Sequence, residues 1–131
     1  MPRRKTPHLT QLELEIMDAI WDTDDATVES IRAHLDAGGR ELALPSIRTM
    51  LGILTEKGYA DRRSEGRKHI YFALVPREEA RTRMLGDLTE KLFAGSPLDL
   101  VSTLINNKMV DRDDLKKVKA MISQAERKQR K

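Results

Sequence analysis

The sequence predicts a mainly helical fold that contains one small β-hairpin. Two changes in the spacing of apolar residues indicate this fold. The spacing is helical up to residue 57, alternates between residues 59 and 74, and becomes helical again after residue 76. A length of 131 residues allows one domain, or one small domain with an appended element, and excludes a multidomain machine.

The first helix is predicted to begin after Thr10. The Thr10 hydroxyl can cap the helix while the Glu13 carboxylate accepts a hydrogen bond from the backbone N–H of the cap. Leu12, Ile16 and Ile20 then recur every four residues, which predicts one buried face. A cluster of aspartates ends the helix.

A second, shorter helix is predicted after Thr27, which can cap it. Val28, Ile31 and Leu35 face inward in this helix, and two consecutive glycines end it. The pattern thus predicts two short helices in succession, each introduced by a threonine.

The third helix is predicted to start around Pro45, since a proline in the first turn loses no helical hydrogen bond. Ile47, Leu51 and Leu54 form its buried stripe, and Gly58 is expected to end it in a left-handed conformation. Small and polar residues dominate the opposite, outward face. They include Arg48, Thr49, Gly52 and Thr55.

The residues after this helix predict a β-hairpin. Ile70, Phe72 and Leu74 alternate along one side of a strand, and residues 59–63 can pair with it through a glycine-containing turn at 64–68. Three helices followed by a basic hairpin is the order of a winged helix-turn-helix. We expect this domain to span residues 1–75.

The remaining residues, 76–131, return to helical spacing in three segments. In the last segment Leu115, Val118, Ile122 and Ala125 alternate spacings of three and four, which suits a seam against a partner helix. An intramolecular core face would have the same spacing. We favour a dimer seam, because the preceding domain is already compact and offers these helices little cover.

Several classes of function are excluded or disfavoured by composition. Without cysteine the chain has no disulfide and no thiolate metal site, and its three histidines are too far apart in sequence to form a helical metal motif. Neither a glycine-rich phosphate loop nor a nucleophile elbow occurs. An aromatic content of 4% disfavours stacking on single-stranded nucleic acid. We expect a protein that is not an enzyme, with no metal and no cofactor.

The N-terminal residues are basic but no apolar segment follows them, and no apolar run approaches the length needed to span a bilayer. We therefore expect a cytoplasmic protein without membrane insertion.

The net charge of the chain is only +3, but acidic residues dominate positions 10–42 and basic residues dominate positions 43–75. This asymmetry suits a face that binds a polyanion, although ordinary solvated charges would give the same pattern.

Double-stranded DNA fits both the third helix and the hairpin. On a helix in the major groove, Arg48 can donate two hydrogen bonds to guanine, and the methyl group of Thr49 can contact thymine. Basic side chains on the hairpin can hold backbone phosphates while the helix reads the bases. The candidate phosphate contacts are Arg62, Arg63, Arg67 and Lys68.

Three segments together resemble the penicillinase repressor (BlaI/MecI/CopY) family. They are LTQLELEIMDAIW at 9–21, SIRTMLGILTEKGY at 46–59 and GRKHIYFALV at 66–75. The resemblance implies a dimeric bacterial repressor whose winged helix binds an inverted-repeat operator, with Ser46, Arg48 and Thr49 at positions that contact DNA. The chain departs from the family at Gly52 and Ile53, where close relatives carry a polar residue and an arginine.

The resemblance also bears on regulation. In the β-lactam-responsive branch a membrane sensor protease triggers cleavage of the repressor, and the matching bond would be Thr103–Leu104, where relatives have Asn-Phe. Copper sensing through C-terminal cysteines, as in another branch, is excluded because the chain has no cysteine.

The alternative to a repressor is a winged helix that binds another protein and no specific DNA sequence. Salt dependence separates the two, since phosphate contacts weaken steeply with salt.

Overall fold

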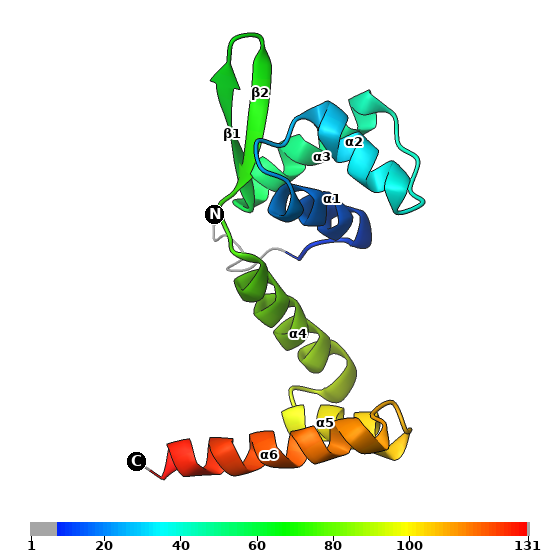
Figure 1. Cartoon of the computed structure of the whole chain (residues 1–131), viewed down its shortest axis with the longest axis vertical. Helices are drawn as coiled ribbons and strands as arrows, with labels where there is room; N and C mark the ends of the chain where they lie inside the picture. Colours follow the sequence, from blue (N-terminus) through cyan, green and yellow to red (C-terminus); the bar gives the residue numbers. More distant parts are fainter. Residues whose placement is uncertain (1–7, 131) are drawn as a thin grey trace. The chain divides into compact units, whose positions relative to one another are not determined.

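The computed structural model describes residues 8–130 (Figure 1). The elements in chain order are α1 (Gln11–Asp22), α2 (Val28–Ala37), α3 (Leu44–Lys57), β1 (Ala60–Glu65), β2 (Lys68–Ala73), α4 (Arg77–Phe93), α5 (Pro97–Asn106) and α6 (Arg112–Gln129). This order confirms the predicted winged helix-turn-helix followed by further helices. The basic N-terminal stretch lies outside the described residues. The chain forms two compact units, one up to Asp87 and one from Leu88, which we describe separately.

Three helices surround the core of the first unit. Their inward side chains include Ile16 of α1, Ile31 of α2 and Leu51 of α3, all without solvent exposure. Burial of each such side chain stabilises the fold by about 1.5–3 kcal/mol relative to leaving it exposed. The apolar stripes predicted from the sequence therefore meet in one core, and they leave the opposite face of α3 turned outward.

Both predicted threonine caps are present. At the start of α1 the backbone N–H of Glu13 donates to Thr10 Oγ1 (3.2 Å), and the backbone N–H of Thr10 donates to Glu13 Oε1 (2.8 Å). At the start of α2 Thr27 forms the same reciprocal arrangement with Ser30. These bonds satisfy donors that a helix start otherwise leaves unpaired, so the two helices begin where the sequence predicts.

Gly58 ends α3 with φ at 84°, the left-handed conformation that a glycine adopts without steric cost. Directly after it Tyr59 is buried, and the hairpin begins at Ala60. The strands pair antiparallel with Ala60 opposite Ala73 and Glu65 opposite Lys68. The hairpin is longer and its loop tighter than the sequence suggested, because pairing continues to the residues beside Gly66.

The three alternating apolar residues of the second strand are not buried alike. Ile70 is buried, whereas Phe72 and Leu74 are exposed. Tyr71, on the other side of the strand, is buried in the core. Its backbone N–H donates to the Ala26 carbonyl (2.8 Å), so β2 also contacts the segment before α2.

The first turns of α4 belong to the first unit. Arg77 forms ion pairs with Asp22 (2.7 Å) and Asp18 (3.5 Å) of α1, and its guanidinium lies over the ring of Trp21. Further along α4, Ala80 is buried in the core. The compact unit therefore continues beyond residue 75. The assignment of 1–75 to DNA binding and of 76–131 to dimerisation stays a prediction.

The second unit exposes much of its apolar surface. Neither α5 nor α6 contains a buried residue. Leu98 of α5 is 75% exposed, and Ile122 of α6 is 51% exposed. Across residues 8–130 no helix combines the length and the apolar character that crossing a membrane requires.

Candidate nucleic-acid interface

The outward face of α3 carries the residues that the sequence singled out. Ser46, Arg48, Thr49, Gly52 and Thr55 are all exposed, while Ile47, Leu51 and Leu54 between them are buried. Ser46, Thr49, Gly52 and Thr55 recur every three residues, and Arg48 lies four residues before Gly52, so the five share one side of the helix. The predicted inward and outward faces of this helix are both confirmed.

The two threonine hydroxyls on this face already donate within the helix. Thr49 Oγ1 donates to the Pro45 carbonyl (3.1 Å), and Thr55 Oγ1 donates to the Leu51 carbonyl (2.9 Å). Each side chain therefore offers a methyl group and the acceptor lone pairs of its oxygen. A methyl group suits contact with thymine, whereas a phosphate oxygen would need a donor.

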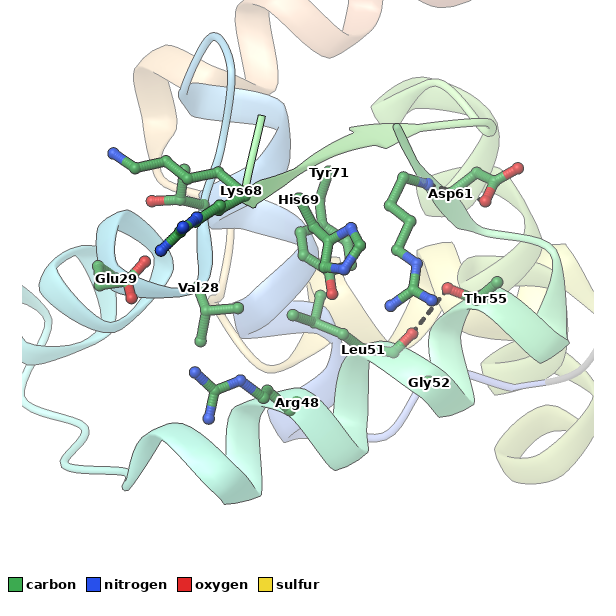
Figure 2. A pocket seen from close by; sticks show the side chains of 13 residues that line it. Val28, Glu29, Arg48, Leu51, Gly52, Thr55, Asp61, Lys68, His69 and Tyr71 are labelled. Carbon is green, nitrogen blue, oxygen red and sulfur yellow. Dashed lines mark hydrogen bonds between the residues drawn. The ribbon is translucent and has the colours of Figure 1, made fainter. Parts of the chain in front are cut away.

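An open groove of about 730 Å³ lies between α3, the hairpin and the start of α2, and we call it the α3–wing groove (Figure 2). Figure 2 shows Arg48 and Gly52 on the α3 side and Lys68 and His69 on the hairpin side. The residues that line the groove are Thr27, Val28, Glu29, Arg48, Leu51, Gly52, Thr55, Asp61, Arg62, Arg67, Lys68, His69 and Tyr71.

The α3–wing groove is positively charged. Arg48, Arg62, Arg67 and Lys68 line it, and within residues 8–130 none of them forms an ion pair. The opposing charges in the lining are two carboxylates, those of Glu29 and Asp61. Cationic groups that are not neutralised by neighbours are available to an anionic ligand.

Arg63, also predicted to bind phosphate, lies outside this groove. Its guanidinium donates to Asp25 (2.8 Å) in the turn between α1 and α2 and to Glu65 (3.2 Å) on its own strand. The hydrogen bond to Asp25, and to a smaller extent that to Glu65, raises the pKa of Arg63 above its ordinary value. Arg62 lines the groove and Arg63 does not, since the Arg63 guanidinium is held by Asp25 and Glu65.

The structure thus brings six of the nine predicted DNA-binding residues to one groove. Ser46 and Thr49 lie on the exposed face of α3 without lining the groove, and Arg63 is paired elsewhere. The start of α2, including Glu29, also lines the groove, and so does His69, whose Nδ1 lies 3.5 Å from Ser64 Oγ. Neither was predicted from the sequence. Thr27 was recognised only as a helix cap, because nothing in the local sequence places it near the hairpin.

The residues predicted for dimerisation and cleavage lie in the second unit. On α6, Leu115 and Val118 are partly exposed and Ile122 and Ala125 are exposed. The Thr103–Leu104 bond lies inside α5, where both side chains are partly exposed. In the part of the chain that the structure describes, no group of histidine and acidic residues is arranged to hold a metal ion.

An exposed helix face beside a basic hairpin, on three helices packed around one core, defines a winged-helix DNA-binding domain of the class found in transcriptional regulators. The chain belongs to the penicillinase repressor family, whose model matches residues 9–124. It is therefore a transcriptional repressor of the BlaI/MecI type and not an enzyme.

Two similar proteins agree with this family, and a third shares only the fold. The methicillin resistance regulatory protein MecI of Mammaliicoccus sciuri is 22% identical over 119 residues, which cover 91% of this chain and 96% of MecI. The solution structure of the DNA-binding domain of the repressor BlaI is 26% identical with a TM-score of 0.50, covering 59% of this chain and 93% of that domain. RosR of H. salinarum, 17% identical with a TM-score of 0.51 and covering 89% of this chain and 93% of that one, shares the fold.

Proposed function

We propose that the protein is a homodimeric repressor that acts in the bacterial cytoplasm and binds an inverted-repeat operator in double-stranded DNA. The observation that carries this proposal is the α3–wing groove, which gathers beside the exposed face of α3 four cations that form no ion pair within residues 8–130. Membership of a repressor family and the likeness to the DNA-binding domain of BlaI support it.

In the proposed complex α3 enters the major groove. Arg48 donates to a guanine, Thr49 contacts a neighbouring base, and Ser46 contacts a base or a phosphate. The arginine suits this role because it is exposed and, among the described residues, forms no ion pair. The Thr49 hydroxyl donates to Pro45, which favours methyl contact with a thymine.

The hairpin holds the sugar–phosphate backbone. Arg62, Arg67 and Lys68 are the proposed phosphate contacts, since they line the groove opposite α3. Phosphate contacts fix the register of the protein on the duplex, and base contacts supply the sequence preference. Arg63 contributes less than its neighbours, because two carboxylates already compensate its charge.

Two copies of the chain join through the second unit. The proposed seam on α6 consists of Leu115, Val118, Ile122 and Ala125. Apolar side chains of α5 and α6 are exposed, which supports a protein–protein interface on this unit. Joining two DNA-binding domains raises the affinity for a symmetric operator by about 10²–10⁴ over a single half-site, because the second contact becomes intramolecular.

Repression ends, in this proposal, when a membrane sensor protease triggers cleavage at Thr103–Leu104 and separates the two copies. Inside α5 the backbone N–H of Asn107 donates to the Thr103 carbonyl (3.1 Å). A protease can reach a bond held in this way only after local unfolding of the helix, so α5 must open before the chain is cut.

Selection of duplexes from a random-sequence pool tests the proposed function. We expect the purified protein to enrich an inverted repeat and to bind it at least about 10³-fold more tightly than a scrambled duplex of the same length. Affinity should fall steeply with salt, with a slope in the double-logarithmic plot of about −0.9 per phosphate contact. A protein-interaction module would enrich no sequence and would show little salt dependence.

A further inference from the structure

Gly52 lies inside a helix, where glycine is destabilising, and nothing in the described part of the free protein compensates for this cost. It lies in the middle of α3, the helix spanning Leu44–Lys57, and it is exposed. A glycine at such a position gives the unfolded chain more freedom and stabilises the helix less than alanine does. The free protein would therefore be more stable with a larger residue here.

Neither packing nor backbone conformation explains the glycine. A Cβ atom added at Gly52 would meet no atom within 4 Å, so no neighbour in the protein needs the space. Gly58 and Gly66 differ from it, because their φ angles of 84° and 62° are ones that other residues adopt only with strain. Within the described structure Gly52 needs to be glycine for neither reason.

The space above Gly52 opens into the α3–wing groove (Figure 2). Arg48, one turn earlier on α3, lies in the same lining, and Arg62, Arg67 and Lys68 face it from the hairpin. The carboxylates of Glu29 and Asp61 are the opposing charges of this lining. The three cations on the hairpin side of the groove suit a chain of phosphates better than the edge of a base, which would need donors and acceptors in a fixed pattern.

We propose that one sugar–phosphate strand of the DNA runs through the α3–wing groove against the backbone of α3, and that Gly52 lets this strand lie closer to the helix than a residue with a Cβ would. The proposal rests on the proposed function and adds to it the place of one DNA strand. Gly52 then sets how close the DNA lies to α3.

Gly86 provides the matched control. It lies inside α4, is exposed, and an added Cβ there would also meet nothing within 4 Å. Replacement of either glycine by alanine should therefore stabilise the free protein to a similar degree. Only the replacement at Gly52 should affect DNA.

The experiment compares wild type, Gly52→Ala and Gly86→Ala. Each is measured by thermal unfolding and by titration of two fluorescent duplexes, one that the wild-type protein selects from a random pool and a scrambled duplex of equal length. We expect both variants to raise Tm by about 2–6 °C. Gly52→Ala should weaken binding to both duplexes by the same factor, about tenfold or more, because both contain phosphates. Gly86→Ala should leave both affinities unchanged.

Three outcomes overturn the inference. Unchanged or tighter binding by Gly52→Ala would show that no strand approaches the helix there, and a loss confined to the selected duplex would place a base edge, not a phosphate strand, above Gly52. A fall in Tm for Gly52→Ala would show that the free protein itself requires the glycine. Failure of the wild-type protein to select any duplex would instead overturn the proposed function, so the two failures are distinguishable.

Discussion

Arg48 and Arg63 are both exposed arginines near the proposed DNA-binding surface, but their neighbours differ. Arg48 has no ion-pair partner among the described residues, whereas Arg63 is held by Asp25 and Glu65. The charge of Arg48 is therefore available to DNA, and that of Arg63 is largely compensated within the protein. This difference leads to separate expectations for the two side chains.

Replacement of Arg48 by alanine should weaken binding to the selected duplex by about 1–3 kcal/mol and relax the preference at one base pair, because a bidentate contact with one guanine is lost. The measurement is a set of titrations against duplexes that each carry one substituted base pair. An equal loss on every duplex would contradict base reading and identify Arg48 as a phosphate contact.

Replacement of Arg62 by alanine should reduce the salt slope of DNA binding by about 1, since one phosphate contact disappears. Arg63→Ala serves as the control. Its charge is already paired, so the slope should stay at the wild-type value. Titrations at several salt concentrations give both slopes, and a drop of about 1 for Arg63→Ala would mean that the arginine leaves Asp25 to bind phosphate.

The sequence could indicate that the hairpin is basic but not which of its cations face DNA. Alternation along a strand predicts that Arg62 and Arg63 point to opposite sides. Arg63 lies outside the groove and is held by Glu65 on its own strand and by Asp25, which is 38 positions away in the chain. The pairing with Asp25 leaves no signal in the local sequence.

At the scale of elements, one ammonium group connects the start of α1 with the end of α3. Lys57 Nζ donates to Glu13 Oε1 (2.7 Å) and to the His8 carbonyl (2.6 Å). Glu13 is also the acidic member of the α1 capping box, and its side chain is buried. The position of α3 therefore depends on a charge pair that lies apart from the α3–wing groove.

Replacement of Lys57 by methionine should lower the free energy of unfolding by about 1–3 kcal/mol, because the buried Glu13 carboxylate loses its charged partner. Urea unfolding followed by circular dichroism measures this change. Arg32→Met on the exposed surface of α2 is the control and should change the value by less than about 0.5 kcal/mol. Equal effects of the two substitutions would show that the Lys57 pair contributes nothing specific.

The helices of the first unit were predictable because each combines an apolar stripe with a local end signal. Thr10, Thr27 and Gly58 act where the sequence places them. The hairpin was less predictable, because its alternating apolar residues Ile70 and Phe72 differ in burial and Tyr71 between them is buried as well. Local signals fix where elements begin and end, and tertiary contacts decide which faces meet.

At the scale of the whole molecule, we expect the proposed dimer through the second unit to contribute most to the affinity for the operator. Replacement of Ile122 by lysine should convert a dimer to a monomer at micromolar concentration, because a charge would be buried in the seam. Affinity for the selected inverted repeat should fall by about 10²–10⁴, while a single half-site is bound as before. Sedimentation velocity and titration measure the two effects.

Gln124→Lys is the matched control, since it adds the same charge to an exposed polar position of α6. It should leave both mass and affinity unchanged. If Ile122→Lys remains dimeric, the seam lies elsewhere on the second unit. The heptad-like spacing of α6 could be read from the sequence, but a spacing alone does not distinguish a partner chain from the protein's own core.

The anchoring of α4 has a practical consequence for shortened forms of the protein. Arg83 lies over the ring of Tyr59, and His8 Nδ1 lies 2.6 Å from Asp87 Oδ2, so the helix covers the base of the winged domain as far as that residue. A stop codon after residue 75 would strip this cover and leave Trp21 and Tyr59 facing water. A stop codon after Asp87 would keep this part of α4, and is therefore the better choice for producing an isolated DNA-binding domain.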